Sequence, residues 1–260
     1  MFNVFRNIRR KLANENAIIQ YTRYAIGEIV LVMVGILLAL QVNNWNVERL
    51  EKIKEKNILE DLRVEFKENL EDAERVAKGN KWIYDGMSKL QFNTLNENYN
   101  RTENDSLMFV LFDWYDYTPK PGASNNLINS GKLDIISNEK LRNLLTVWTG
   151  IVAELEDDEL VAKNYSQNFI VPFLVENYPL SNIEPIDLGD TYYNSKSNES
   201  IGSIILEPIL YSVENLLKNG IFQSHVSAKK LYAIHNFKES QEVINTCIQV
   251  LELIDLELRQ

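Results

Sequence analysis

An unbroken apolar run near the start of the chain constrains its fold more than any other feature. Ala25–Val42 reads AIGEIVLVMVGILLALQV and contains a single charged residue, Glu28. A helix of this length rises about 27 Å, close to the roughly 30 Å hydrocarbon core of a bilayer. A helix of a soluble protein usually hides one apolar stripe and shows a polar face, but this run has no polar face. We therefore predict a transmembrane helix over residues 25–45.

A cleaved signal peptide is the alternative interpretation of this run. The apolar region of a signal peptide is usually about 7–15 residues long and ends at a cleavage site built from small residues. The run here is longer, and Leu38-Ala39-Leu40-Gln41 is a poor match to such a site. We therefore favour an anchor that stays in the membrane.

Residues 1–24 form a basic amphipathic segment in front of the anchor. They contain five basic residues and one acidic residue, and such a segment can lie on the anionic cytoplasmic leaflet. Tyr24 and Trp45 are placed to anchor the two ends of the helix at the membrane interfaces. Four basic residues follow the helix closely, so charge favours a cytoplasmic N-terminus by a narrow margin only. We expect the C-terminal domain on the other side of the membrane.

Several residues within the predicted span are candidates for contacts with a partner. Glu28 and Gln41 are polar groups inside the apolar run. Glu28 lies about one turn inside Tyr24, so it could reach the headgroup region at modest cost, and a role in partner pairing or proton relay is the alternative. The remaining candidates recur at multiples of four residues on one face, although Leu31 interrupts the series: Gly27, Gly35, Ala39 and Asn43. Small residues four apart allow membrane helices to approach closely. We expect this face to mediate association with a second copy or with another membrane protein.

The anchor resembles a known family signature. Residues 24–46, YAIGEIVLVMVGILLALQVNNWN, are similar to Y-x-I-G-E-I-x-L-V-x-x-G-I-x-x-A-L-Q-x-N-N-W, which is typical of a family of uncharacterised bacterial single-pass membrane proteins, a domain of unknown function. The resemblance extends to residues 128–150 and 171–178. It implies a single-pass inner-membrane anchor with a periplasmic domain, and it implies no established activity.

The rest of the chain predicts an all-α domain on a stalk. Residues 46–57 are dense in opposite charges at helical spacing, which stabilises an exposed helix without burial. Residues 58–260 are expected to form an extramembrane bundle with long antiparallel helices. The apolar stripe that begins at Leu59 is predicted to end at Gly79-Asn80, and a second helix is predicted over about 81–95.

The later part of the bundle shows several helix boundaries. Asp105 or Ser106 is expected to cap a helix that ends near Trp114, and Gly131 is expected to close a short helix over 124–130. Asn138 is expected to cap a long helix that Pro172 kinks or divides near Phe169. Residues 178–200 are predicted to be irregular, and a helix over about 206–217 is predicted to end at Asn219-Gly220.

The last helix is predicted to begin near Ser224 and to pack against the first. Its apolar positions follow a spacing of three and four, as in a coiled coil: Phe237, Ser240, Ile244, Cys247, Leu251, Ile254 and Leu258. Antiparallel packing against the stripe at 59–76 would bury this seam. Cys247, the single cysteine, is therefore expected to be core filler rather than a reactive thiol.

Charge and motifs exclude several function classes. Residues 46–260 contain 35 acidic and 22 basic residues, and an acidic domain repels phosphate backbones, so we expect no nucleic-acid binding. No phosphate-binding glycine loop, nucleophile elbow, H-E-x-x-H motif or kinase signature is present. We expect no cofactor and no metal site. His225 and His235 are about 15 Å apart along one helix, and the acidic run at 154–159 lacks the ligand spacing of a calcium loop.

Two other segments invite a chemical role. Ser130 and Lys132 could act as a nucleophile and its base, but that chemistry needs a lysine in a dry pocket, and a helix-terminating turn explains both residues. A ligand cleft near residues 113–121, which are rich in aromatic side chains, is an alternative to a purely structural role.

The hypothesis that these observations favour is a membrane-anchored, non-enzymatic interaction or scaffold module of the cell envelope. Its expected partners are membrane lipid and either a second copy of the chain or another envelope protein. A periplasmic sensory or small-ligand-binding domain is the alternative, and a hydrolase that uses Ser130 and Lys132 is a third possibility.

Overall fold

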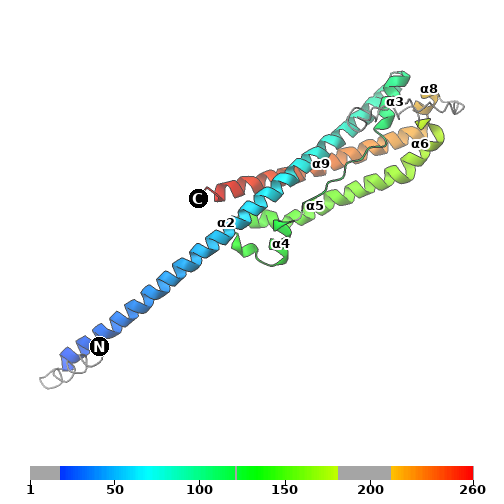
Figure 1. The fold of residues 1–260 in the computed structure, drawn as a ribbon. Coiled ribbons are helices and arrows are strands. Elements are labelled where there is room, and N and C mark those ends of the chain that lie inside the picture. Colours follow the sequence, from blue (N-terminus) through cyan, green and yellow to red (C-terminus); the bar gives the residue numbers. More distant parts are fainter. Residues whose placement is uncertain (1–17, 121, 181–211, 260) are drawn as a thin grey trace, which may run out of the picture. The chain divides into compact units, whose positions relative to one another are not determined.

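The computed structural model of the protein describes residues 18–120, 122–180 and 212–259, and the side chains from residue 21 onward (Figure 1). The chain divides into two compact units, residues 1–57 and 58–260. Helices dominate the described residues and no strand occurs among them, which confirms the all-α class. Residues 1–17 of the expected basic segment and residues 181–200 of the expected irregular segment lie outside the described residues.

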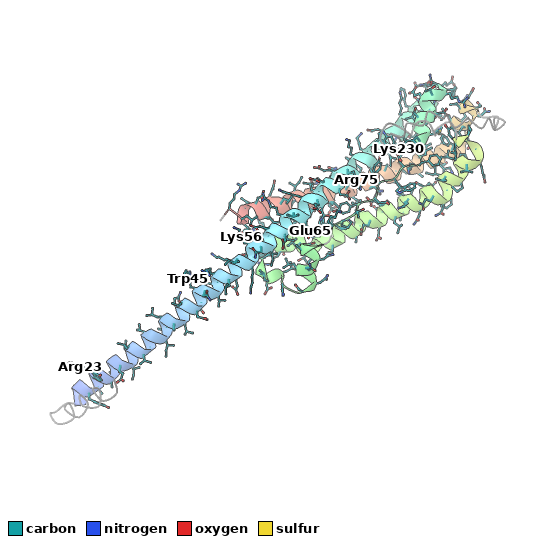
Figure 2. All side chains as sticks on the ribbon, in the orientation of Figure 1. Arg23, Trp45, Lys56, Glu65, Arg75 and Lys230 are labelled. Carbon is teal, nitrogen blue, oxygen red and sulfur yellow. The ribbon has the colours of Figure 1, made fainter. Side chains whose placement is uncertain are left out.

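The first helix, α2 (Ile18–Leu95), contains the apolar run. Between residues 21 and 50 its side chains are exposed, apart from the half-buried Tyr24 and Ala25. Figure 2 shows side chains projecting from this part of the helix on all sides. By length and composition the helix is able to cross a membrane, and it is the one such helix among the described residues.

The second unit is built from three long helical segments, namely residues 58–95 of α2, α5 (Glu139–Tyr165) and α9 (Gly220–Glu257). Arg63 pairs with Asp255 at 2.8 Å, and Gln91 donates to Ser227 at 2.9 Å, so α9 runs antiparallel to α2. The pairing of Asn138 with Glu257 shows that α9 also runs antiparallel to α5. The expected long antiparallel helices are therefore confirmed.

The prediction that a helix ends at Gly79-Asn80 is wrong. The chain continues as one helix through to Leu95. A Cβ atom at Gly79 would lie 2.3 Å from the ring of Tyr115, so the glycine allows an aromatic side chain to pack directly on the backbone of α2. The glycine allows close packing of the Tyr115 ring and does not form a turn.

Side-chain caps define the starts of several helices. The Asn138 side chain accepts from the Leu141 N–H, as predicted. The next helix after α2 is α3 (Arg101–Phe109), and its cap is Asn100 rather than Asp105 or Ser106. Asp105 instead lies buried within α3, where it accepts a hydrogen bond from the Tyr178 hydroxyl at 2.8 Å.

A short helix and a tight turn follow, close to the predicted positions. The helix α4 (Ala123–Asn129) leads to Gly131, which has a φ of +66° and so adopts the left-handed conformation that was expected. The 3₁₀ turn η1 (Leu133–Ile135) then connects to α5.

Pro172 changes the helix locally, as predicted. α5 passes into a π-helical turn, η2 (Ser166–Ile170), and then into α6 (Val171–Asn177), where the proline occupies the first turn. Proline has no N–H to donate and its ring crowds the carbonyl of the previous turn. The wider π turn accommodates both effects.

The last two helices begin at positions that differ from the prediction. The helix α8 covers Val213–Leu217, and residues 206–211 lie outside the described part of the chain. α9 begins at Gly220 instead of Ser224, because the Asn219 side chain accepts from the N–H groups of Ile221 and Phe222. The pair Asn219-Gly220 therefore starts a helix as well as following one.

The interior of the bundle contains two apolar clusters. The first joins α2, α5 and α9 and includes Phe66, Trp148 and Cys247, with the rings of Phe66 and Trp148 4.8 Å apart. The second joins α2, α3, α6, α8 and the first half of α9 around Met87 and Phe222. Cys247 is fully buried, as expected of core filler.

Candidate functional site

A layer of buried polar side chains lies between the two apolar clusters. On α2 the first cluster ends at Ala77 and the second begins at Ile83, with the buried Asn80 between them. On α5 the corresponding residue is Glu159, and α9 contributes Asn236 and Lys229. Buried polar groups in a bundle core are costly unless they are satisfied, so this layer is the part of the interior where packing alone does not explain the sequence.

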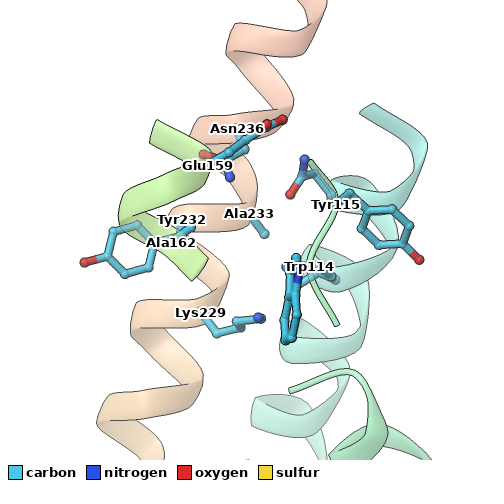
Figure 3. A pocket seen from close by; sticks show the side chains of 10 residues that line it. Trp114, Tyr115, Glu159, Ala162, Lys229, Tyr232, Ala233 and Asn236 are labelled. Carbon is cyan, nitrogen blue, oxygen red and sulfur yellow. The ribbon is translucent and has the colours of Figure 1, made fainter. Parts of the chain in front are cut away.

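The polar layer opens into a small pocket. Its wall includes all four of these polar residues, and Figure 3 shows Lys229 reaching from α9 toward the indole of Trp114. Trp114 is partly exposed, so the pocket lies near the surface of the bundle. Its space is enough for about one or two water molecules. A metabolite would fit only if side chains moved.

The segment that follows α3 closes one side of the pocket. Tyr115 lies in the wall beside Trp114. The backbone N–H of Tyr117 donates to Glu159 Oε2 at 2.7 Å, and the carbonyl of Asp113 accepts from Lys229 Nζ at 2.6 Å. The expected cleft at 113–121 therefore corresponds in part to this pocket.

Polar side chains on one face of α2 hold the continuation of this segment. The N–H of Thr118 donates to Asp72 Oδ2 at 2.8 Å, and the N–H of Lys120 donates to Asn69 Oδ1 at 2.7 Å. Glu65 accepts both the backbone N–H and the hydroxyl of Ser124. Residues 65, 69 and 72 are spaced by four and three, so they share one face of α2. They supply the acceptors that a neighbouring strand would otherwise provide.

Glu159 is held in an environment that favours its neutral form. Burial raises its pKa from 4.5 to about 8, and the nearby carboxylates of Asp116, Glu156 and Asp72 act in the same direction. The hydrogen bond from the Tyr117 N–H opposes this rise. The second carboxyl oxygen, Oε1, is buried and has no hydrogen-bond partner within the described residues. A proton on this carboxyl group is therefore favoured at neutral pH.

Lys229 is the complementary group of the layer. Burial lowers its pKa from 10.5 to about 8, while the charge of Asp113 opposes the shift. Its ammonium donates to the Asp113 carbonyl and, at 2.9 Å, to the hydroxyl of Ser166 in the π turn. The layer thus holds a carboxyl group and an amine whose pKa values are both shifted by burial to about 8, beside a pocket with room for water or a very small polar molecule.

The residues of this layer were missed in the sequence, although a signal was present. The acidic run at 154–159 contains the exposed Glu154, Glu156 and Asp157 together with the buried Glu159. Glu159 continues the buried stripe of Val152 and Leu155 at the same helical spacing. Likewise Lys229 and Asn236 lie on the α9 stripe that buries Val226 and Ala233, upstream of the seam identified in the sequence.

The candidate contact residues of the predicted membrane span lie on the part of α2 that belongs to the first unit. Gly27, Gly35, Ala39 and Asn43 are exposed along the first unit, and a Cβ atom at either glycine would meet nothing within 4 Å. The polar Glu28 and Gln41 and the aromatic Trp45 are exposed too, whereas Tyr24 is half-buried. Their roles in association and anchoring stay predictions.

The other chemical candidates are separate from the layer. Ser130 and Lys132 are both exposed, so the dry pocket that a hydrolase mechanism needs does not surround Lys132. The two histidines have different neighbours on α5: His225 Nδ1 lies 3.1 Å from the Tyr165 hydroxyl, and His235 Nδ1 lies 3.2 Å from Asp158 Oδ2.

Comparison with known proteins gives one match. Residues 28–151 match a family of unknown function, DUF6090. The match begins within the apolar run and ends in the first half of α5, so it includes Asn80 of the polar layer and Trp114 of the pocket wall but not Glu159 or Lys229. This part of the chain is thus similar to an uncharacterised domain family. Neither a curated protein nor a solved structure matches the chain.

Proposed function

We propose that the protein is a membrane-anchored helical module of the cell envelope that binds another protein and catalyses no reaction. The anchor would place the bundle at the membrane surface, and the face of small residues would form the contact within the membrane. The similarity of residues 28–151 to DUF6090 covers both the apolar run and the first part of the bundle, which supports treating them as parts of one architecture.

The exposed apolar run of α2 is the observation that carries this proposal. Leu31, Leu38 and Val42 are 74%, 62% and 63% exposed, and their neighbours are exposed as well. Burying such a side chain in apolar surroundings is favourable by about 1.5–3 kcal/mol. A bilayer supplies those surroundings along the whole run, and the helix satisfies the backbone hydrogen bonds internally, as lipid requires.

The proposed location is the inner membrane of a bacterium with two membranes, crossed once. The basic residues ahead of the helix favour a cytoplasmic N-terminus, and the bundle would then lie in the periplasm. Fusion of alkaline phosphatase after Gln260 should give an active enzyme, because it folds only outside the cytoplasm, whereas a green fluorescent protein fused there through the Sec route should stay dark. The reverse pattern would contradict the orientation.

The face of Gly35, Ala39 and Asn43 is the proposed contact surface within the membrane. Exposed glycines with open space at the Cβ position allow another helix to approach the backbone closely. The same face is suited to a second copy of the chain and to a different envelope protein, and the identity of the crosslinked product decides between them.

Site-specific photocrosslinking in living cells tests this proposal. Photoreactive residues at Ala39 and Asn43 should give a discrete product with a protein partner, and the same residue at Leu37, about 200° around the helix from Ala39, is the matched control. Mass spectrometry then identifies the product. Equal crosslinking at Leu37 and Ala39, or labelling of lipid alone at all three positions, would contradict a protein contact on this face.

A ligand-responsive domain is the second candidate, and the polar layer is the observation that favours it. Glu159 and Lys229 face one pocket with shifted pKa values, and such groups gather at functional sites. A thermal-shift screen of the full chain in detergent should then find a small polar molecule that stabilises the wild type. The same molecule should have no effect on Lys229→Met, and a response that survives this substitution would place the ligand elsewhere.

A further inference from the structure

A second group of ligating side chains lies on the surface between α5 and α9, outside the pocket. Asp158 of α5 faces His235 and Glu239 of α9, and one ligand atom from each lies within 4.8 Å of the other two. Asp158 Oδ2 and His235 Nδ1 are 3.2 Å apart. The three residues therefore converge on one point.

The spacing of these atoms fits a metal ion. Nitrogen and carboxylate oxygen bind Zn²⁺ at about 2.0–2.2 Å, so the ligand atoms of a tetrahedral site lie about 3.3–3.6 Å apart. The 3.2 Å separation of Asp158 Oδ2 and His235 Nδ1 is close to this range. A ligand atom of Glu239 lies within 4.8 Å of those of Asp158 and His235, so the third ligand has to come closer to complete the site.

The fold explains why these residues meet. His235 and Glu239 are four apart on α9 and so share one face of the helix. The antiparallel partner α5 presents Asp158 to that face, and the contacts of Tyr165 with His225 and of Asn138 with Glu257 fix the register on either side. A metal ion at this point would link the two helices.

Local charge favours a cation as well. The negatively charged side chains of Glu154, Glu242 and Asp158 act on the carboxylate of Glu239 and repel it. An ion with two positive charges would offset this repulsion more fully than one protonated imidazole can.

We propose that Asp158, His235 and Glu239 bind a divalent transition metal ion such as Zn²⁺, with water completing its coordination. Imidazole as one of three ligands favours Zn²⁺ over Mg²⁺, which prefers an all-oxygen environment. The ion would bridge α5 and α9 and stabilise their packing. The competing explanation is an ion pair between Asp158 and protonated His235 that needs no metal.

Calorimetric titration with Zn²⁺ distinguishes these explanations. The full chain is purified in detergent without a histidine tag, stripped with EDTA and titrated near pH 7. The wild type should bind one Zn²⁺ with micromolar affinity, and His235→Asn and Glu239→Gln should each weaken binding at least about tenfold, since even outer-shell partners cost that much. His235 is two-thirds exposed, so its substitution should leave the fold unchanged, which circular dichroism checks.

His225→Asn is the matched control, because His225 is the other histidine of the chain and contacts Tyr165 rather than carboxylates. It should bind Zn²⁺ like the wild type. Absence of Zn²⁺ binding by the wild type at millimolar concentration would overturn the proposal and leave the ion pair. Equal binding by the wild type and His235→Asn would also overturn it, as would an equal loss in His225→Asn.

Discussion

Substitution of Gly79 tests how closely the segment after α3 packs on α2. Replacing it with alanine would place a Cβ atom 2.3 Å from the Tyr115 ring, so the ring or the helix must shift. Overpacking of this kind costs about 1–3 kcal/mol, and the better helix propensity of alanine returns up to about 1 kcal/mol. We expect a net loss in the free energy of unfolding of Gly79→Ala, measured by urea unfolding in detergent.

Gly150→Ala is the control for this change. Gly150 lies in the interior of α5, is exposed, and has nothing within 4 Å of its Cβ position. The alanine should therefore raise the free energy of unfolding by about 0.5–1 kcal/mol. If both variants were stabilised equally, the close approach of Tyr115 would be wrong.

Glu159 and Lys229 should make stability depend on pH in opposite directions. Between pH 4.5 and about 8 the folded state keeps a proton on Glu159 that the unfolded state has released, so stability falls as pH rises. Between about 8 and 10.5 the unfolded state keeps the proton on Lys229 that the folded state has released, so stability rises with pH. Each slope approaches about 1.4 kcal/mol per pH unit, and the joint contribution is lowest near pH 8.

Two substitutions separate the fall in stability below pH 8 from the rise above it, in urea unfolding measured from pH 5 to 10. Glu159→Gln should flatten the decline in the free energy of unfolding below pH 8 and leave its rise above pH 8 unchanged. Lys229→Met should flatten the rise above pH 8 and leave the decline below pH 8 unchanged. Asp157→Asn, an exposed neighbour on the same helix whose charge does not act on Glu159, should change neither the decline below pH 8 nor the rise above it. A Glu159→Gln protein with the wild-type slope below pH 8 would show that this carboxyl group titrates normally.

At the scale of elements, the helices were predictable and their polar interior was not. Caps and glycine signals located α4 and the start of α5, because Asn138 and Gly131 act within one turn of the chain. The same signals failed at Gly79, where the reason for the glycine lies 36 residues away in Tyr115. The hydrogen bonds from residues 118–124 to side chains of α2 could not be predicted either. In the sequence, polar side chains on a helix surface resemble solvated residues until the segment that they bind is known.

The buried Cys247 can report whether α9 stays packed against the other helices of the bundle. Burial raises the pKa of its thiol to about 12, so the reactive thiolate is about 10³ times scarcer than at the ordinary pKa of 9. In the native protein at pH 8 we expect the thiol to react with a chromogenic disulfide only through unfolding of α9. The measured rate should rise to that of free cysteine in concentrated urea, and fast labelling without urea would contradict a closed seam.

At the scale of the whole molecule, anchoring depends on what surrounds the first part of α2. Val34 and Ile53 are 46% and 48% exposed on the same helix, so an exposed helix in water would tolerate arginine equally well at both positions. In a bilayer only Val34 lies in hydrocarbon, where arginine costs about 2.5–3.5 kcal/mol near the centre. Two such substitutions, Val34→Arg with Leu38→Arg, should release the protein from membranes washed in alkaline carbonate.

The matched pair Leu50→Arg with Ile53→Arg should stay in the membrane pellet, because residues 46–57 are already dense in charge and are expected to lie in water. Immunoblots of pellet and supernatant measure the distribution, and a protease-protection assay separates release from aggregation. Release of both double variants to the same extent would mean that the apolar run is not surrounded by lipid. A wild-type protein found in the supernatant would contradict the anchor itself, and the proposed contact between membrane helices would then have no place to form.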